Sequence, residues 1–307
     1  MTKIFIDGSH GTTGLRIANR LSQRKDISVI SLSDEVRKDP AARADAINSA
    51  DVVFLCLPAP AAMEAVAMTE NPNTKIIDTS TAHRVNPDWV YGMPELKGQL
   101  EAIQNSTRIA NPGCHASGFI ALVAPLVQEG MIDPNTALSC FSLTGYSGGG
   151  KKMIAEYEDP NRSPLLKAPR QYALTQQHKH LKEMQKLCGL GTAPIFCPIV
   201  ADFYSGMEVT VPVFAHELKG TMAQLKDLYK TYYQGGLIHY TDESDPDGML
   251  SANAWADRDD MSITVQGNEE RMILTARFDN LGKGASGAAI QNMNILLGFD
   301  QATGLSI

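Results

Sequence analysis

A glycine-rich turn between a strand pattern and a helix pattern stands at the start of the chain, and it constrains the fold more than any other feature. Residues 3–7 (Lys-Ile-Phe-Ile-Asp) are typical of a short buried strand, and an amphipathic helical pattern begins at Leu15. Between them Gly8, Gly11 and Gly14 recur at every third position. Glycine lets the backbone approach a pyrophosphate, which a helix N-terminus binds. Tight turns need glycine in any case, but the strand before and the helix after favour nucleotide binding.

The alternation of strand and helix continues through the first third of the chain. Strands are expected at residues 27–32, 52–57 and 75–78, and helices at 41–50 and 61–68. This alternation is typical of a parallel sheet whose strands are joined by helical crossovers. We therefore predict an α/β fold with a doubly wound parallel sheet of the Rossmann type.

The second half of the chain has a different pattern. Strand-like segments follow one another with fewer helices between them, at residues 137–144, 195–200, 207–214, 262–266 and 272–278. This order indicates an α+β domain whose sheet can pair across a subunit interface. A last apolar helix is expected at residues 290–297.

A cysteine lies at a predicted turn in residues 111–114 (Asn-Pro-Gly-Cys), shortly before an apolar run from Gly118 to Leu126 that is typical of a buried helix. Proline and glycine favour the turn, so Cys114 is expected near the N-terminus of that helix. Backbone amides and the positive end of the helix dipole would stabilise a thiolate there, and also a developing oxyanion. The alternative is an inert buried thiol, the usual state of cysteine.

The remaining cysteines, Cys56, Cys140, Cys188 and Cys197, lie in apolar segments or beside glycine, and packing explains them. No two cysteines have the C-x-x-C spacing of a zinc site or a dithiol redox pair, so no metal is expected. The odd count of five and the lack of a signal-peptide pattern indicate reduced thiols and a cytoplasmic location.

Size and charge exclude several classes of function. The 307 residues, 43% of them hydrophobic, can bury a large core, and the length favours two domains. The net charge of −7 argues against binding to nucleic acid or to an anionic membrane. No apolar run approaches the roughly 18 residues of a membrane span. We expect a soluble enzyme.

The segment after the predicted strand 27–32 bears on the choice of cofactor. A free ribose 2′-hydroxyl calls for an acidic residue, whereas a 2′-phosphate prefers basic or hydroxyl partners. Ser31, Ser33 and Asp34 precede Arg37 and Lys38 here. We therefore predict NADP.

Five motifs in order resemble the shorter form of the N-acetyl-gamma-glutamyl-phosphate reductase family, within the semialdehyde dehydrogenase superfamily. They are the glycine turn at 8–14, Asp-Thr-Ser-Thr-Ala-His-Arg at 78–84, Tyr-Gly-Met-Pro-Glu-Leu at 91–96, Asn-Pro-Gly-Cys at 111–114, and Asp-Asn-Leu-Gly-Lys-Gly-Ala at 279–285. Together they cover essentially the whole chain.

The resemblance implies NADPH-dependent reduction of N-acetyl-L-glutamyl 5-phosphate to N-acetyl-L-glutamate 5-semialdehyde plus phosphate, in arginine biosynthesis. In the implied mechanism Cys114 attacks the acyl phosphate, and hydride reduces the resulting thioester. The segment Gln176–Met184 matches the family's His-x-His-x-x-Glu, so His178 and His180 are the candidate acid–base residues. On a helix, residues two apart face different sides, so we expect only one to face the thiol. His115 departs from the aromatic residue common in the family, and no role is assigned to it.

The predicted binding residues complete the expected site. Cofactor contacts are expected from Gly8, Gly11, Thr12, Thr13, Gly14, Ser33, Lys283 and Gly284, and substrate contacts from Arg84, Ser147, Gly148 and Lys151. The loop at 145–152 is rich in glycine, and its amides could bind an anion, although such loops often have no ligand. The predicted domains are an NADP-binding domain (1–116 and 283–307) and a catalytic and dimerisation domain (117–282).

Three other functions can be compared with the reductase assignment. Aspartate-semialdehyde dehydrogenase shares the cysteine chemistry, but residues 91–96 and the paired histidines favour the first assignment. A non-catalytic nucleotide-binding regulator would not need Cys114 together with those histidines. A cysteine hydrolase would not need the glycine turn at 8–14. We expect a homodimer or a homotetramer acting on a small acyl phosphate.

Overall fold

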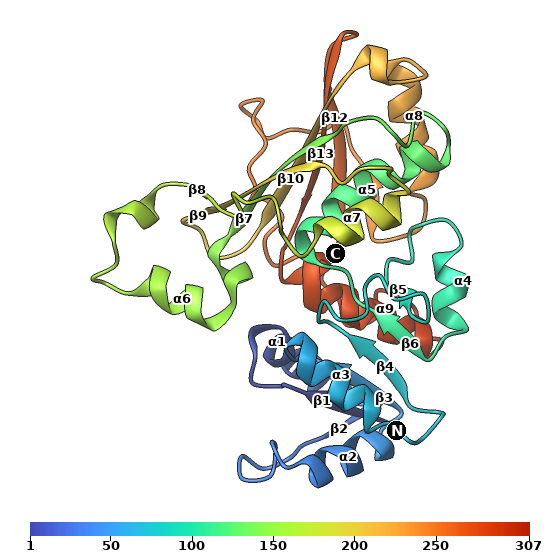
Figure 1. The fold of residues 1–307 in the computed structure, drawn as a ribbon, viewed down its shortest axis with the longest axis vertical. Helices are drawn as coiled ribbons and strands as arrows, with labels where there is room; N and C mark the ends of the chain where they lie inside the picture. Colours follow the sequence, from blue (N-terminus) through green and yellow to red (C-terminus); the bar gives the residue numbers. More distant parts are fainter. The chain divides into compact units, whose positions relative to one another are not determined.

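The computed structural model describes residues 1–307, which divide into two compact units (Figure 1). Unit 1 comprises Met1–Pro112 and Ala285–Leu305, and unit 2 comprises Gly113–Gly284 and the last two residues. The chain thus leaves the first unit and returns to it. That residues 1–116 and 283–307 bind NADP and residues 117–282 carry catalysis and dimerisation stays a prediction. No helix has both the length and the apolar character needed to cross a bilayer.

Unit 1 contains a six-stranded sheet in the order β2-β1-β3-β4-β6-β5, and every pairing in it is parallel. The strands are β1 (Thr2–Asp7), β2 (Ile27–Ile30), β3 (Val52–Leu55), β4 (Lys75–Asp78), β5 (Val90–Tyr91) and β6 (Arg108–Ala110). The doubly wound parallel sheet is therefore confirmed. The sequence did not predict β5 and β6, because strands of two or three residues have too little periodicity to detect.

Helices cover both faces of this sheet. They are α1 (Thr12–Leu21), α2 (Pro40–Ser49), α3 (Ala59–Ala67), α4 (Gln99–Gln104) and α9 (Gly287–Leu296). Alternate strand residues face opposite sides. Ile4 and Phe54 pack in one apolar cluster with residues of α1 and α9, whereas Phe5 and Val53 pack in another with residues of α2 and α3. Both faces are thus buried, which explains the continuous apolar strands of the sequence.

Unit 2 contains a mixed seven-stranded sheet in the order β11-β12-β13-β10-β7-β9-β8. Its strands are β7 (Ser139–Gly145), β8 (Arg170–Gln171), β9 (Ile195–Ala201), β10 (Met207–Phe214), β11 (Ile238–Tyr240), β12 (Met261–Gly267) and β13 (Arg271–Phe278). The five strands predicted in this half are all present, so the α+β character is confirmed. The central strands β10 and β13 pair along their whole length in antiparallel register, from Met207 opposite Phe278 to Phe214 opposite Arg271.

The helices of unit 2 are α5 (Cys114–Gln128), α6 (Gly150–Glu158), α7 (Leu181–Cys188) and α8 (Met222–Tyr232). Short 3₁₀ or π turns lie at Tyr146–Gly149, Pro164–Lys167, Ala215–Glu217 and Gly282–Ser286. Helix α5 is buried from His115 to Leu126 and packs against β10, β13 and α7. A Cβ at Gly118 would overlap the side chain of Val209, which explains a glycine inside this helix. The helix starts at Cys114, four residues before the predicted apolar run.

The two faces of the second sheet differ in exposure. On β7, Cys140 and Ser142 are buried on the side that α5 covers, whereas Phe141 between them is 46% exposed. Ile195 on β9 and Ile273 on β13 are also exposed. A large apolar surface of this kind marks an interaction site more often than a free surface.

Candidate active site

The glycine turn after β1 is shaped by close backbone contacts. Gly8 has a φ of +89°, and a Cβ on it would overlap the carbonyl oxygen of Cys56. A Cβ on Gly14 would overlap the carbonyl oxygen of Gly8. The amide of Gly11 donates to that same oxygen at 3.0 Å, and Gly11 is the N-cap of α1 without a side-chain cap. The first amides of α1, at Thr12 and Thr13, therefore have no acceptor within the helix and can bind an anion.

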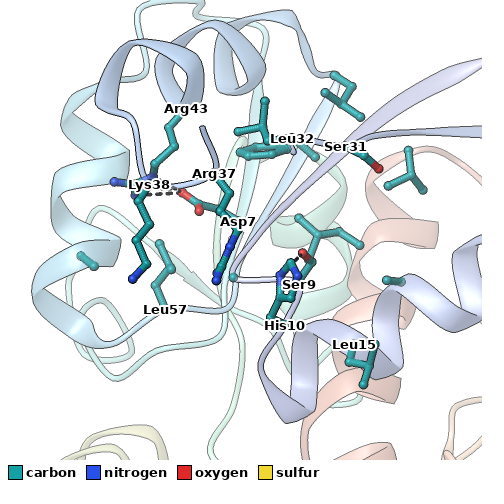
Figure 2. Close-up of a pocket in the computed structure, with 17 residues that line it drawn as sticks. Asp7, Ser9, His10, Leu15, Ser31, Leu32, Arg37, Lys38, Arg43 and Leu57 are labelled. Atoms are coloured by element: carbon teal, nitrogen blue, oxygen red, sulfur yellow. Dashed lines mark hydrogen bonds and ion pairs between the residues drawn. The ribbon is translucent and has the colours of Figure 1, made fainter. Parts of the chain in front are cut away.

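A cavity of about 490 Å³ lies beside this turn in unit 1 (Figure 2). It is lined by the ends of β1 and β2, by the start of the glycine turn and by three basic side chains. Figure 2 shows Arg37 and Lys38 beside the ion pair of Arg43 with Asp7, whose shortest distance is 2.9 Å. Asp7 is the only acidic lining residue and pairs with Arg43, while Arg37 pairs with Asp34 outside the lining at 2.9 Å, so Lys38 is the basic lining residue without an ion-pair partner.

The serine predicted to contact the cofactor lies next to this cavity rather than in it. Ser31 is among the lining residues and Ser33 is not. The backbone carbonyl of Ser33 accepts hydrogen bonds from the amides of Val36 and Arg37, so Ser33 shapes the turn that carries Arg37. The sequence placed both serines after β2 and had no basis for choosing between them.

In unit 2, Cys114 is the first residue of α5, and Gly113 is the N-cap without a side-chain cap. The Gly113 amide donates to the buried carboxylate of Glu183 at 3.2 Å. Gly284 packs against the nucleophile from another segment, because a Cβ there would lie 3.0 Å from the Cβ of Cys114. Cys114 is half-buried and forms no disulfide.

The other cysteines differ from Cys114. Burial raises the pKa of the Cys56 thiol to about 12, and burial also raises the pKa of Cys140 and Cys188. A thiol held protonated in this way is a poor nucleophile. The structure therefore agrees with packing roles for these three residues.

The paired histidines lie just before α7, not on a helix. Helix α7 begins at Leu181, and His180 is its N-cap. The ring centroids of His178 and His180 are 4.6 Å apart, and the amide of His180 donates to Nδ1 of His178 at 3.2 Å. The helical placement assumed for the pair is therefore wrong, whereas the expectation that only one of the two rings faces the thiol stays a prediction. His180 Nε2 lies 3.8 Å from the Glu183 carboxylate, which can orient the ring.

Three residues that the sequence analysis did not assign, His115, Ser142 and Tyr172, belong to the same cluster. His115 Nδ1 lies 2.6 Å from Ser142 Oγ, and His115 Nε2 lies 2.7 Å from the Tyr172 hydroxyl. The His115 ring centroid lies 5.8 Å from that of His178 and 5.6 Å from that of His180. The position of His115 beside Cys114 was a signal that could have been used. Tyr172 and Ser142 have no motif around them, and only the fold brings them together.

The predicted substrate loop follows β7. Ser147 is buried, and its hydroxyl accepts a hydrogen bond from the Asn280 amide at 3.0 Å. Gly148 is exposed, and Lys151 is exposed in the first turn of α6. Since Asn280 belongs to the segment that also carries Lys283 and Gly284, the fold brings the loop and this segment together.

Arg84 lies in unit 1. Its Nε donates to the carbonyl of Asn111 at 3.0 Å, and its Nη2 donates to the carbonyl of Thr79 at 3.0 Å. These bonds hold the turn before Cys114 to the end of β4. Arg84 thus has a bracing role within unit 1, and its contact with substrate stays a prediction.

Comparison with known families agrees with this geometry. A family model for the NAD-binding domain of semialdehyde dehydrogenases matches residues 3–106, and one for their dimerisation domain matches residues 114–280. Fold and models together define a semialdehyde dehydrogenase with a nicotinamide-cofactor domain. Proteins of Brucella ovis and Brucella canis, each named N-acetyl-gamma-glutamyl-phosphate reductase, are 46% identical over 96% of this chain and 99% of their own length. The chain belongs to the N-acetyl-gamma-glutamyl-phosphate reductase family.

Solved structures support the fold. An aspartate-semialdehyde dehydrogenase II of Vibrio cholerae has a TM-score of 0.71 at 15% identity, covering 97% of this chain and 98% of that one. The enzyme of Candida albicans, solved with NADP, has a TM-score of 0.68 at 16% identity over the same fractions. Identities this low show a shared architecture, so these structures do not favour aspartate semialdehyde as the substrate.

Proposed function

We propose that the chain reduces N-acetyl-L-glutamyl 5-phosphate to N-acetyl-L-glutamate 5-semialdehyde with release of phosphate, a step of arginine biosynthesis. The observation that carries the proposal is the setting of Cys114. It is the only cysteine at a helix N-terminus, and it has paired histidines and a buried carboxylate in its unit. The family membership supplies the acyl phosphate as the substrate class.

Cys114 is the nucleophile in this proposal. Its thiolate attacks the acyl carbon, the carbon–oxygen bond to phosphate breaks, and phosphate leaves with the bonding electrons, giving a thioester. The start of α5 stabilises both the thiolate and the oxyanion of the tetrahedral intermediate, because backbone amides there point at the added charge. NADPH, when bound, supplies the hydride that reduces the thioester carbon. The thiolate is then expelled as the aldehyde forms.

His178 and His180 handle the proton in the proposed reaction. The Cys114 thiol must lose its proton before attack, and a nearby imidazole can accept it. The Glu183 carboxylate faces His180, and it also holds the Gly113 amide. It thereby ties the histidine segment to the turn of the nucleophile. The pair acts as one unit here, since each ring contacts the other.

NADP is the proposed cofactor. The cavity beside the glycine turn fits a dinucleotide that carries an additional phosphate, because Arg37 and Lys38 line it and its one carboxylate is neutralised by Arg43. Of the acidic residues after β2, neither Asp34 nor Glu35 lines the cavity, and Asp34 pairs with Arg37 at 2.9 Å. Gly8, Gly11 and Gly14, with Thr12 and Thr13, would hold the pyrophosphate. Lys283 and Gly284 stay predicted contacts of the nicotinamide half.

The substrate contacts are proposed on the loop after β7. Ser147 and Gly148 lie on a 3₁₀ turn, and Lys151 offers a cation at the start of α6. The Ser147 amide already donates to the carbonyl of Tyr204 at 3.0 Å, so the proposed donors to an anion are the Ser147 hydroxyl and the Gly148 amide. Arg84 remains a candidate contact for the same anionic groups, by virtue of the family motif at 78–84.

We further propose a homodimer or homotetramer in the cytoplasm. The exposed face of the second sheet, with Phe141, Ile195 and Ile273, is the proposed contact surface, and a dimerisation-domain model matches this unit. The five thiols agree with a reducing compartment. Light scattering after gel filtration measures the assembly. Phe141→Arg should shift it toward the monomer, whereas Leu165→Arg, at an exposed site away from the sheet, should not.

The decisive assay is the reverse reaction. Purified protein is mixed with NADP, phosphate and N-acetyl-L-glutamate semialdehyde, and NADPH formation is followed by absorbance. Phosphate-dependent activity with the acetylated substrate supports the proposal. Activity with aspartate semialdehyde alone would assign the chain to the sister reaction, and no activity with either would point to a non-catalytic nucleotide-binding protein.

A further inference from the structure

Three neighbouring strands of unit 2 share a row of residues at one end of the sheet. Thr144 on β7, Met207 on β10 and Phe278 on β13 are partners across this row. Asn280 lies two residues beyond Phe278, and only 2% of it is exposed. Its side chain contacts a residue next to each of the other two strands, so it joins the three strand ends. The proposed mechanism gives this residue no role.

The orientation of the Asn280 amide follows from its two contacts. The backbone N–H of Gly206 can only donate, so the atom that lies 2.9 Å from it is Oδ1 of Asn280. The other amide atom is therefore Nδ2, which can only donate, and it lies 3.0 Å from Ser147 Oγ. The hydroxyl oxygen of Ser147 thus accepts a hydrogen bond, and the hydroxyl proton must point elsewhere.

The Ser147 hydroxyl proton has no acceptor within the chain. Only 1% of Ser147 is exposed, and Asn280 is the one partner of its hydroxyl. The backbone of Ser147 is already paired, since its amide donates to the Tyr204 carbonyl and its carbonyl accepts from the Gly150 amide. A buried donor without an acceptor costs free energy, which an acceptor on a bound ligand would offset. Ser147 therefore offers a ligand a hydrogen-bond donor.

The turn that carries Asn280 also packs against the nucleophile. The Gly284 amide donates to the Asp279 carbonyl at 2.9 Å, which closes residues 279–284 into a turn. A Cβ on Gly284 would lie 3.0 Å from the Cβ of Cys114. One short segment therefore contacts Ser147 through Asn280 and Cys114 through Gly284. A substrate bound at Cys114 would lie next to the segment that orients the Ser147 hydroxyl.

We propose that Asn280 is a positioning residue, which holds the Ser147 hydroxyl as a hydrogen-bond donor to an anionic oxygen of the substrate. The direction of this bond selects the ligand chemistry, because a donor favours a phosphate or carboxylate oxygen over a group that itself donates. The inference rests on the proposed function in taking Ser147 as a substrate contact. It adds the residue that decides where the hydroxyl proton points.

Asn280→Asp tests the direction of the bond with little change in side-chain shape. One carboxylate oxygen can still accept from the Gly206 amide, but the other puts an acceptor where Nδ2 was a donor. The Ser147 hydroxyl must then turn and donate to the carboxylate, so the substrate anion meets lone pairs. Since a hydrogen bond to a charged group is lost, the anion should bind about 10- to 100-fold more weakly. Ser147→Ala removes the same donor and should weaken binding by about 10-fold.

The measurement is the protection of Cys114 from iodoacetamide in the full-length protein, followed on the Cys114 peptide by mass spectrometry. Inorganic phosphate and N-acetyl-L-glutamate are titrated separately as protecting anions. The anion whose half-protecting concentration rises in Ser147→Ala identifies the group that Ser147 binds, a phosphate or a carboxylate. In the reverse reaction, the KM for phosphate or for the semialdehyde should rise accordingly. If neither anion protects the wild-type protein, no anion site lies beside Cys114 and the inference is overturned.

A double variant shows whether Asn280 acts through Ser147. In the Ser147→Ala background, Asn280→Asp should raise the half-protecting concentration by less than about threefold, because the hydroxyl that it redirects is already absent. An equal loss in both backgrounds would mean that the new charge repels the anion directly, and the positioning role would be overturned.

Asn268→Asp is the matched control for the new carboxylate. Asn268 lies between β12 and β13, and its Oδ1 accepts from the amides of Glu270 and Arg271, both at 2.9 Å, as a carboxylate also can. Ser262→Ala is the control for the lost hydroxyl, since Ser262 on β12 is fully buried and its hydroxyl has no partner. Both controls should leave protection unchanged. A loss as large as that of the test variants would indicate general loosening of unit 2 and overturn the inference.

The outcomes separate this inference from the proposed function. An active wild type with unchanged protection and KM values in Asn280→Asp and Ser147→Ala would overturn the inference and leave the function standing. A rise confined to the KM for NADP would assign the hydroxyl to the cofactor and also overturn it. An inactive wild type whose protection weakens as expected in the variants would support the inference and contradict the function. If Asn280→Asp fails to fold, as judged by circular dichroism, Asn280→Ala in the two backgrounds decides the question.

Discussion

Helices α1 and α5 begin in the same way and carry different chemistry. Each follows a glycine N-cap that offers no side chain to the first amides, Gly11 for α1 and Gly113 for α5. The first residues of α1 are partly exposed beside an open cavity. Those of α5 are buried from His115 onward. Cys114 itself is half-buried, as Thr12 and Thr13 are, so the two helix starts differ in the residues that follow rather than in the first one.

The difference shows how one set of backbone donors serves two purposes. At α1 the anion is external, and glycines are needed so that it can approach the backbone. At α5 the proposed anion is the thiolate of Cys114, the first residue of the helix, and histidines, Tyr172 and Gly284 lie around the helix start. Substitutions at the two helix starts should therefore affect different measurements.

The largest effect is expected from Cys114→Ser. A serine hydroxyl at this position is far less ionised than the thiol, so no thioester forms, and reductase activity should fall by at least about 1,000-fold. NADPH binding, followed by the fluorescence of the bound dinucleotide, should stay within about twofold of wild type, because the glycine turn belongs to the other unit. Loss of both properties would mean that the two helix starts are not independent.

Gly14→Ala should lower the affinity for NADPH and leave the reactivity of Cys114 unchanged. The added Cβ would overlap the carbonyl oxygen of Gly8, so the turn must shift and its amides must lose their alignment. We expect NADPH affinity to fall by roughly 10- to 100-fold. The rate of Cys114 alkylation without cofactor should not change. A decrease in alkylation equal to the loss of affinity would contradict the separation of the two sites.

Gly11→Ala is the milder substitution for comparison with Gly14→Ala. A Cβ there would lie 3.4 Å from the carbonyl oxygen of Gly8, an ordinary contact, and Gly11 has a φ of ordinary sign. Its effect on NADPH affinity should be clearly smaller than that of Gly14→Ala. The ranking of the two alanine variants in one fluorescence titration tests whether close approach, rather than glycine content, makes the turn bind.

Lys38→Ala tests whether the cavity beside α1 discriminates NADPH from NADH. Lys38 is exposed at the rim of the cavity, and no ion-pair partner is present for it, so its charge can serve a 2′-phosphate (Figure 2). NADPH affinity should fall by about 10-fold, as expected for one partly screened charge pair, and NADH affinity should change little. Equal losses for the two dinucleotides would show that Lys38 contacts a group which both of them share.

The sequence predicted the fold well because its signals are local. The strand, turn and helix at residues 2–21 are recognisable from neighbouring residues, and the apolar runs of β3 and β4 are buried on both faces as their composition indicated. Helices α6 and α8 were not predicted, although α8 carries a capping box of Thr221 with Gln224 and buries Leu225 and Tyr229, four positions apart. Their position depends on the tertiary contacts of unit 2.

The candidate site could be predicted only in part. Cys114 and the histidine pair lie in short motifs, and the structure places those histidines within one cluster. The conformation of the pair was misjudged, because a helix was assumed where the chain is still irregular. Tyr172 and Ser142 could not be found, since they are 58 and 28 positions beyond Cys114 and interact only through the folded sheet. Short motifs point to the proposed nucleophile, but they do not identify the residues that the fold brings near it.

The last prediction concerns stability, and it tests whether burial at α5 is as complete as the comparison requires. His115 has a folded pKa of about 3 against 6.5 for an ordinary histidine, so between these values the unfolded chain takes up a proton that the folded chain does not. The free energy of unfolding should therefore fall as the pH falls from 6.5 toward 3, by roughly 1.4 kcal/mol per pH unit inside that window. In His115→Gln this contribution is absent.

Urea denaturation of both proteins at several pH values measures the difference. The wild-type advantage over His115→Gln should shrink as the pH falls below 6.5 and stay constant above it. Other groups, such as His239 with its burial-lowered pKa, contribute equally to both proteins and cancel. His216→Gln, at an exposed histidine, should run parallel to wild type. Parallel curves for His115→Gln would mean that the ring takes up protons in the folded state, and that the start of α5 is as open to solvent as the start of α1.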